Sequence, residues 1–288
     1  MASKLIIYGG QPLHGQVDIS GAKNAALPIL AASLLTQGQV CLGNVPHLVD
    51  ITVMLQLLSD LGVEVALNDQ NQVILKAAII RKNTVSYALV KAMRASIVVL
   101  GPLLSRFGHA RVALPGGCAI GARPIDVHLS GLKAMGAKVE LEEGYVTATV
   151  SPGRLKGAKI KMPVVSVTGT ENLMMAACLA SGTTIIENAA REPEVYDLGE
   201  MLIKMGALIK GHGTSKITIE GVSELGECQH SILPDRIEAG TYLIAGALIG
   251  KKLLINNIET QFIKNEIKIL KKMGVKLNVN KNFIEIFK

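Results

Sequence analysis

Residues 27–45, LPILAASLLTQGQVCLGNV, hold the pattern that decides the fold. An apolar run with helical spacing ends at a glycine, and an alternating, strand-like run follows at once. The same pattern returns at 97–114, 173–189 and 242–258, at intervals of about 70 residues. The sequence therefore predicts a repeat protein. We expect a glycine to end each of these helices as a left-handed C-cap, at Gly38, Gly108, Gly182 and Gly250.

A second pattern lies between these segments. A helix-like run ends in Leu/Met-Gly-Ala/Val, and a short strand-like run follows, at 57–67, 132–141, 202–211 and 270–279. Its glycines are Gly62, Gly136, Gly206 and Gly274. Each repeat is therefore predicted to run helix, strand, helix, strand, strand. Because one repeat cannot bury its own apolar faces, we expect an α/β (α+β) fold in which the repeats pack around shared helices.

The composition limits the function classes. The chain has 288 residues, 49% of them hydrophobic and 18% charged, which is enough for two ordinary domains. No Trp and only 3% aromatic residues argue against binding single-stranded nucleic acid, which relies on stacking. The net charge of +7 is concentrated near the C-terminus, so the rest of the chain suits small anionic substrates as well as a polyanion.

Cysteine spacing and apolar run lengths predict the compartment. The four cysteines are far apart, without a CxxC pair or metal-ligand spacing, which favours a reducing compartment and no metal site. No apolar run approaches the roughly 20 residues of a membrane span. We therefore expect a cytoplasmic protein that uses neither a membrane nor nucleic acid.

Basic residues open three of the predicted repeat helices. Lys23 lies in the first turn of its helix, where a cation is unfavourable unless an anion shares the site or the side chain reaches solvent. Arg94 and Arg236 occupy the equivalent places in the second and fourth repeats. If the repeats are related by pseudo-symmetry, these cations converge and suit a phosphate or carboxylate. For Arg236, a salt bridge supported by the helix cap is the alternative.

Several polar residues are predicted to cap these helices. Ser20 is expected to cap the first repeat helix, and Asp235 with Glu238 forms a capping-box pattern around the last. In 162–175, MPVVSVTGTENLMM, we expect Thr170 to cap the helix that follows. The residues before that helix form a candidate substrate loop, although an ordinary loop-to-helix junction explains them equally well.

A glycine-rich loop surrounds one cysteine. In 114–124, LPGGCAIGARP, the glycines permit close approach of the backbone to a ligand, and Arg123 would favour the thiolate of Cys118. From these residues alone, Cys118 is either a reactive thiol or a buried small apolar side chain. Asp126 and His128 follow closely, as ligand-binding groups or as ordinary capping and surface residues.

Five separated motifs, in the same order, resemble the UDP-N-acetylglucosamine 1-carboxyvinyltransferase family of enolpyruvyl transferases. They are SGAKNAALPI at 20–29, MRASI at 93–97, LPGGCAIGARPIDVH at 114–128, ENAAREPE at 187–194 and LPDRIE at 233–238. The resemblance covers about 5–252. The shikimate-pathway enolpyruvyl transferases share the fold and phosphoenolpyruvate but lack the PGGC loop and the GARPIDVH stretch, so they match less well.

The resemblance implies an inside-out α/β barrel of the enolpyruvyl transferase type, with six repeats in two domains and the active site in the cleft between them. The implied reaction moves the enolpyruvyl group of phosphoenolpyruvate to the 3-hydroxyl of UDP-N-acetylglucosamine and releases phosphate, the first committed step of peptidoglycan synthesis. It requires no cofactor and no metal.

The resemblance also implies roles for matching residues. Lys23 would bind phosphoenolpyruvate with Asn24 beside it, and Arg94 and Arg123 would hold anionic groups. Cys118 would be the general acid that protonates the methylene carbon, and the residue that fosfomycin-type epoxides alkylate. The implied catalytic residues are thus Cys118, Lys23 and Arg123.

The implied UDP-sugar site consists of Arg94 and two strips of chain. These residues are Arg94, Arg123, Pro124, Ile125, Asp126, Val127, Val164, Val165, Ser166 and Val167. Val164 stands where the family usually has a lysine, so a contact to uridine or phosphate is expected to be lost.

The resemblance further implies a chain truncated at its C-terminus, with four of six repeats. Residues 1–21, with a strand expected over 5–19, would belong to a second domain; 22–229 would be a complete repeat domain, and 230–288 an incomplete part of the second domain. The absent third would carry the aspartate that takes the proton of the attacking hydroxyl. Three interpretations stay open: an active transferase, a ligand-binding remnant without turnover, and a split enzyme completed by a separate polypeptide.

Overall fold

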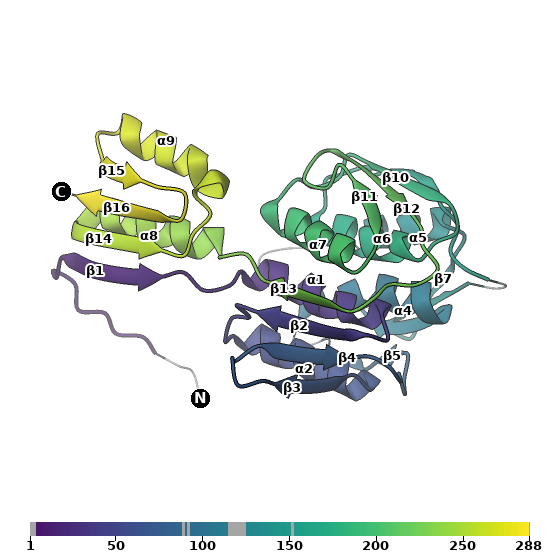
Figure 1. The fold of residues 1–288 in the computed structure, drawn as a ribbon. Helices are drawn as coiled ribbons and strands as arrows, with labels where there is room; N and C mark the ends of the chain where they lie inside the picture. Colours follow the sequence, from purple (N-terminus) through teal and green to yellow (C-terminus); the bar gives the residue numbers. More distant parts are fainter. Residues whose placement is uncertain (1–3, 88–89, 91–92, 115–124, 151–152, 288) are drawn as a thin grey trace. The chain divides into compact units, whose positions relative to one another are not determined.

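The chain forms two compact units in a computed structural model that describes residues 4–87, 90, 93–114, 125–150 and 153–287 (Figure 1). The large unit is Lys23–Leu233, and the small unit joins Met1–Ala22 to Pro234–Lys288. The large unit is therefore one continuous segment inserted between two pieces of the small unit.

Four four-stranded sheets share one topology. The large unit contains the strand orders β13-β2-β4-β3, β5-β6-β8-β7 and β11-β12-β10-β9, and the small unit contains β1-β14-β16-β15. In each sheet one outer strand pairs in parallel with its neighbour and the other pairs are antiparallel. The strands of the large unit are β2 (Gln39–Gly43), β3 (Glu64–Leu67), β4 (Val73–Lys76), β5 (Thr84–Val85), β6 (His109–Ala113), β7 (Lys138–Glu142), β8 (Tyr145–Thr149), β9 (Lys159–Lys161), β10 (Thr183–Glu187), β11 (Leu208–Lys210), β12 (Lys216–Glu220) and β13 (Cys228–Ser231). Those of the small unit are β1 (Leu13–Asp18), β14 (Gly250–Asn256), β15 (Lys276–Val279) and β16 (Phe283–Phe287).

The helices follow the predicted repeat. The first helix of each repeat is α1 (Lys23–Ala32, extended by η1, Ser33–Leu35), α4 (Leu100–Phe107, preceded by η2, Arg94–Val99), α6 (Val167–Cys178) and α8 (Arg236–Ile249). The second is α2 (Val49–Leu61), α5 (Asp126–Ala134), α7 (Pro193–Lys204) and α9 (Lys264–Lys272, preceded by η3, Thr260–Ile263). The predicted order of helix, strand, helix, strand, strand is confirmed in all four repeats.

The parallel strand that begins three of the sheets, namely β5, β9 or β13, was not predicted from the sequence. These strands have two to four residues, too few to show a period. In the small unit, β1 covers only Leu13–Asp18, so the expected strand over 5–19 was too long. The apolar side chains of Leu5, Ile6, Ile7 and Tyr8 are 64–89% exposed.

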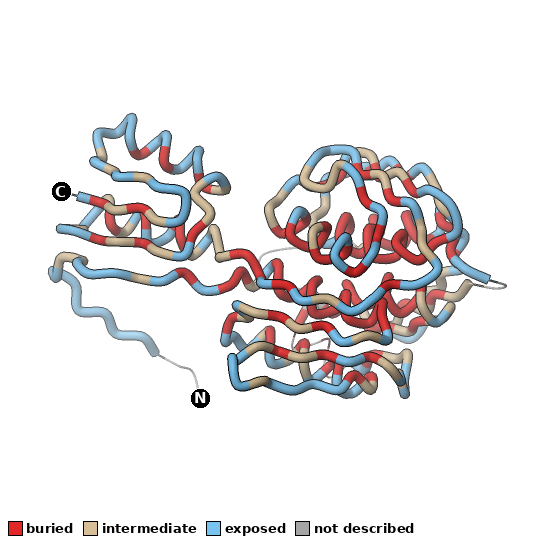
Figure 2. Tube along the Cα trace, viewed as in Figure 1, coloured by how far each residue is buried: buried red, intermediate tan, exposed pale blue. Residues whose placement is uncertain are grey.

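The first helices form the centre of the large unit. Helices α1, α4 and α6 contact one another, directly or through η1 and η2. In α1 every residue after Asn24 is buried, and α6 is buried from Gly169 to its end (Figure 2). From Ala25 in α1 and from Leu173 in α6 these helices are apolar all round, and such a helix is stable only when neighbours cover every side.

Of the four predicted left-handed C-caps, Gly108 is confirmed at the end of α4, whereas Gly182 is left-handed but lies beyond Leu179, the C-cap of α6. Gly62, Gly108, Gly136, Gly182, Gly206 and Gly274 have φ between 69° and 112°. Gly250 does not, because its φ is −72° and it begins β14. Gly38 does not have a positive φ either. A Cβ at Gly38 would lie 2.8 Å from the backbone nitrogen of Glu227. Gly38 is therefore required by close packing and not by handedness.

Two predicted helix caps are wrong. Thr170 lies inside α6, and the N-cap is Ser166, whose Oγ accepts from the Gly169 N–H at 3.1 Å. Ser20 lies before the start of α1, and its hydroxyl donates to Glu238 Oε2 at 2.5 Å. That contact is within the small unit and explains the position of Ser20 better than a cap.

The predicted capping box at α8 is half confirmed. Asp235 is the N-cap, and its Oδ1 accepts from the N–H groups of Ile237 at 2.8 Å and Glu238 at 3.2 Å. The Glu238 carboxylate does not return to Asp235, because it binds the backbone N–H and hydroxyl of Ser20 instead.

Candidate functional site

Lys23 is held at the start of α1 by an acid from the neighbouring helix. Its Nζ lies 3.0 Å from Asp50 Oδ2, near the start of α2, and the two side chains are 40% and 34% exposed. An ion pair this exposed contributes roughly 0–1 kcal/mol. Lys23 therefore keeps access to solvent and to an anionic ligand. Asp50 was not among the predicted site residues, although an acid in the first turn of a helix is a usable signal.

The other predicted basic positions open helices as expected. Arg94 is the first residue of η2, and Arg236 is the first residue of α8. The side chain of Arg94 lies outside the described part of the chain, so its predicted contact with an anion stays a prediction. Asn24, beside Lys23, is exposed.

The glycine-rich loop falls outside the described residues. Cys118, Arg123 and Pro124 all lie between 115 and 124. Their predicted roles as acid, anion-binding group and UDP-sugar contact therefore stay predictions.

The described parts of the two predicted UDP-sugar strips lie side by side. Ile125 is the N-cap of α5, and Asp126 and Val127 form its first turn. Ser166 caps α6, and a Cβ on Gly169 would lie 3.0 Å from Val127 Cγ1. The structure therefore brings the starts of α5 and α6 into contact.

The second strip presents apolar surface and helix-terminal N–H groups. Val164 and Val165 are 56% and 57% exposed. Val167 begins α6, where the first N–H groups have no partner within the helix. An exposed helix start of this kind can bind an anionic oxygen, and the valines can contact an apolar face of a ligand.

A buried histidine joins the two strips. His128, in the first turn of α5, is 3% exposed; its Nδ1 lies 2.9 Å from Asn172 Nδ2 and its Nε2 lies 3.4 Å from Thr168 Oγ1. Burial lowers the pKa of His128 from 6.5 to about 4. His128 is therefore neutral at pH 7. Asn172, a buried amide in α6, was not among the predicted site residues.

The shifted pKa of His128 predicts a loss of stability in acid. The folded protein keeps His128 neutral down to about pH 4, whereas the unfolded chain takes up a proton near pH 6.5. The contribution of His128 to the free energy of unfolding is complete above pH 6.5. This contribution falls by up to about 3 kcal/mol between pH 6.5 and 4. Urea unfolding at pH 7 and 4.5 should show this loss in the wild type but not in His128→Gln. The exposed His47→Gln variant is the control, and equal pH dependence in His128→Gln and the wild type would contradict the prediction.

A second buried polar group lies beside Asn172. Glu171 is 1% exposed, and its Oε1 has no hydrogen-bond partner among the described residues. Burial raises the pKa of Glu171 well above its usual value, and the charges of Glu194 and Glu192 add to this. Its surroundings therefore favour the protonated form of Glu171, and the buried part of α6 includes the polar side chains of Thr170, Glu171 and Asn172.

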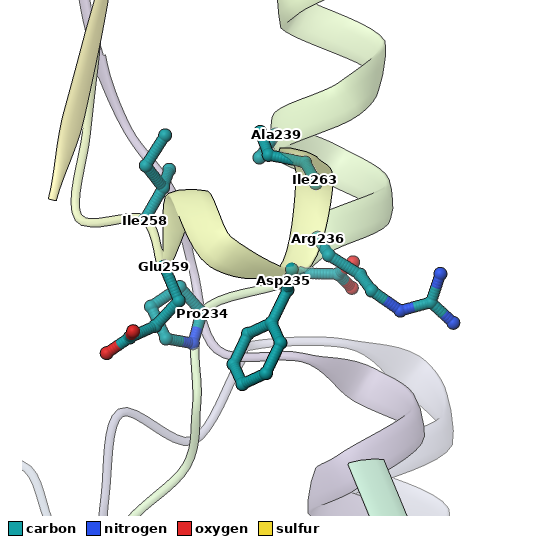
Figure 3. A pocket seen from close by; sticks show the side chains of 8 residues that line it. Pro234, Asp235, Arg236, Ala239, Ile258, Glu259 and Ile263 are labelled. Carbon is teal, nitrogen blue, oxygen red and sulfur yellow. The ribbon is translucent and has the colours of Figure 1, made fainter. Parts of the chain in front are cut away.

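The start of α8 has a small hollow of its own. It is lined by residues of the small unit: Pro234, Asp235, Arg236, Ala239, Ile258, Glu259, Phe262 and Ile263 (Figure 3). The space, at most about 190 Å³, is smaller than the roughly 300–1,000 Å³ of most ligand pockets. This hollow is therefore no substrate site by itself.

Metal-ligand clusters and membrane-spanning helices are both absent from the described residues. No group of three or more His, Cys, Asp or Glu side chains there is placed to hold a metal ion. No helix in that part of the chain is long and apolar enough to cross a membrane.

Comparison with known proteins gives one family. The family described as EPSP synthase (3-phosphoshikimate 1-carboxyvinyltransferase) matches residues 7–288. Curated proteins named UDP-N-acetylglucosamine 1-carboxyvinyltransferase are 49% identical in Halorhodospira halophila and 52% identical in Coxiella burnetii, each over 283 residues. These matches cover 98% of this chain and 67% and 65% of the relatives. The chain thus spans about two thirds of the length of the curated relatives it matches.

Solved structures share the fold. The enolpyruvyl transferase NikO from Streptomyces tendae superimposes with a TM-score of 0.85 at 23% identity, covering 98% of this chain and 67% of that one. EPSP synthase from Acinetobacter baumannii gives 0.76 at 19% identity, covering 97% and 65%. The predicted α/β repeat fold of the enolpyruvyl transferase type is confirmed.

Proposed function

Because this chain belongs to the EPSP synthase family of enolpyruvyl transferases, we propose that it serves the transfer of an enolpyruvyl group from phosphoenolpyruvate to the 3-hydroxyl of UDP-N-acetylglucosamine. The relatives at 49% and 52% identity carry the name of that activity. The structure named EPSP synthase is only 19% identical. The nucleotide sugar is therefore the better supported acceptor, and peptidoglycan synthesis in the cytoplasm the better supported context.

The observation that carries this proposal is the contact between the starts of α5 and α6. Val127 and Gly169 meet there, and Val164 and Val165 stay exposed beside the first turn of α6. A nucleoside diphosphate offers what such a surface can bind, namely an anionic diphosphate and an apolar base face.

The proposed chemistry balances with the residues of this chain and one further base. The 3-hydroxyl oxygen adds to C2 of phosphoenolpyruvate while the Cys118 thiol protonates C3, and the hydroxyl proton passes to a carboxylate. One proton then returns from C3 to the Cys118 thiolate while phosphate leaves with the proton held by the carboxylate, which restores the double bond. Lys23, held by Asp50, would neutralise the charge of phosphoenolpyruvate. The carboxylate is assigned to repeats beyond the four described here.

An apolar helix face supports the proposal of further repeats. On α8, Ile237, Ile244 and Leu248 are 52%, 49% and 78% exposed along one stripe, whereas α1 after Asn24 and α6 from Gly169 onward are buried. In the large unit the first helices of three repeats cover one another. By analogy, α8 requires the first helices of two more repeats to cover its exposed face. We assign that place to the repeats of the last third of the curated relatives, whether joined to this chain or supplied as a separate polypeptide.

Nucleotide-sugar binding tests the proposed function. Isothermal titration calorimetry should show saturable binding of UDP-N-acetylglucosamine by the purified chain. Val165→Asp should weaken it about tenfold or more, because like charges about 4 Å apart repel by roughly 1–4 kcal/mol. Leu208→Asp, at a similarly exposed position on β11, is the matched control and should bind normally. Binding of 3-phosphoshikimate without binding of the nucleotide sugar would favour the shikimate-pathway alternative.

A further inference from the structure

A chain of polar groups, which we call the polar relay, links four residues of the large unit: Gly101, Asn172, His128 and Thr168. Asn172 lies on α6 with no exposed surface, where an unpaired amide would be costly. Its Oδ1 accepts from the Gly101 N–H at 2.7 Å. Because a backbone N–H can only donate, the atom facing Gly101 must be the amide oxygen, and Nδ2 must face His128.

The orientation of Asn172 determines the tautomer of His128. Nδ1 of His128 accepts from Asn172 Nδ2 at 2.9 Å, so the ring proton of the neutral histidine is on Nε2. Nε2 in turn lies 3.4 Å from Thr168 Oγ1 and donates to it in a long hydrogen bond. Every donor in the relay therefore points in the same direction, from Gly101 toward Thr168.

The hydroxyl of Thr168 ends the relay. Its oxygen accepts from His128, so its single proton is directed to another acceptor. Among the described residues no acceptor for that proton is found, and Thr168 is exposed. Thr168 lies in the first turn of α6, next to the proposed contact strip for the nucleotide sugar.

Close packing keeps the relay in place. A Cβ on Gly101 would lie 2.5 Å from both the backbone oxygen and Oδ1 of Asn172. A Cβ on Gly131, in α5, would lie 2.4 Å from Leu173 Cδ2. Helix α6 therefore meets α4 and α5 at distances that glycine permits and larger residues do not. The amide and the imidazole cannot separate unless these helices move.

We propose that Thr168 donates its hydroxyl proton to an anionic oxygen of the nucleotide sugar, and that Asn172 and His128 are positioning residues that keep this proton directed at the ligand. The inference rests on the proposed function for its ligand. It gives roles to Thr168, Asn172 and His128, to which the resemblance assigned none. A phosphate oxygen only accepts hydrogen bonds, so a threonine directed to donate suits it and a threonine directed to accept does not.

Binding of UDP-N-acetylglucosamine to four variants tests the proposal by calorimetry. Thr168→Val keeps the shape and removes the donor, and should weaken binding about tenfold. Thr168→Ser should remain within about twofold of the wild type. Asn172→Asp keeps the acceptor for Gly101 but removes the donor to His128, so the imidazole turns its N–H toward position 172 and Thr168 must donate to Nε2. It should therefore weaken binding as much as Thr168→Val.

The double variant separates a relay from a merely structural effect. If Asn172 acts through the hydroxyl, Thr168→Val combined with Asn172→Asp should bind no more weakly than either single variant. If the losses of affinity in the two single variants multiply in the double variant, the relay is refuted. Binding by Thr168→Val equal to that of the wild type would overturn the ligand contact.

Nitrogen-15 NMR of the histidine side chains gives a readout that needs no ligand. In the wild type, His128 should show a proton on Nε2 and none on Nδ1, and Asn172→Asp should show a proton on Nδ1. The opposite tautomer in the wild type would overturn the relay even if the nucleotide sugar binds. A wild type that does not bind the nucleotide sugar would refute the proposed function and the ligand contact, while the tautomer would still decide the relay.

Discussion

Cys118→Ala is expected to lower phosphate release from phosphoenolpyruvate and UDP-N-acetylglucosamine at least about a hundredfold, because general acid catalysis typically contributes 10²–10⁴-fold. The measurement uses this chain mixed with the last third of the Coxiella burnetii relative, expressed as a separate polypeptide that supplies the further repeats. Cys118→Ser is the conservative comparison, since a hydroxyl is a weaker acid than a thiol. Undiminished turnover by Cys118→Ala would refute the assignment of the proton donor.

The same mixture tests the apolar face of α8. Leu248→Asp should abolish the gain in turnover that the added repeats bring, because Leu248 is 78% exposed on the face assigned to them. Leu208→Asp, on β11 of the large unit, should leave the gain unchanged. If Leu248→Asp is complemented as well as the wild type, the added repeats do not pack on α8. If the chain alone turns over as fast as the mixture, the further base is not required.

Gly101→Ala is expected to lower the free energy of unfolding of the large unit by about 3 kcal/mol, the upper part of the range for overpacking in a core. The added methyl would lie 2.5 Å from the backbone oxygen of Asn172, which cannot move aside as a flexible side chain would. The variant would also weaken the hydrogen bond from the Gly101 N–H. Urea unfolding followed by circular dichroism measures the loss.

Gly240→Ala is the matched control. It too lies inside a helix, but nothing is within 4 Å of the position that its Cβ would occupy. Alanine there should stabilise the small unit by up to about 1 kcal/mol, through its better helix propensity. A Gly101→Ala variant within about 0.5 kcal/mol of the wild type would mean that α4 and α6 can move apart at little cost.

Local patterns predicted the repeat well, and distant contacts explain the errors. The ends of five helices follow from glycines such as Gly62 and Gly206, whose left-handed backbone is a local property. The prediction for Gly38 was wrong because the residue that requires a glycine there is Glu227, which lies far along the chain. The predicted helix cap at Ser20 was wrong for the same reason, since the hydrogen-bond partner of Ser20 is the distant Glu238.

The candidate site likewise consists of positions that local patterns predict and of contacts between separate helices that they do not predict. Lys23 and Arg94 were placed at helix starts correctly, because helical periodicity fixes where a helix begins. The pairing of Lys23 with Asp50 and the chain from Asn172 to Thr168 depend on how separate helices meet, which no spacing in the sequence encodes. The predicted roles of Cys118 and Arg123 rest on the glycine-rich loop around them and on the resemblance.

The parallel pairing of β1 with β14 has a consequence for synthesis on the ribosome. Leu13 pairs with Gly250, so β1 emerges long before its partner exists. At about 5–20 residues per second, the wait is roughly 10–50 s. During that time the whole large unit can fold while β1 presents an unpaired edge, which is an opportunity for wrong pairing between nascent chains. A trigger-factor-like chaperone that shields the first 22 residues should therefore raise the yield of this protein more than one that binds the large unit.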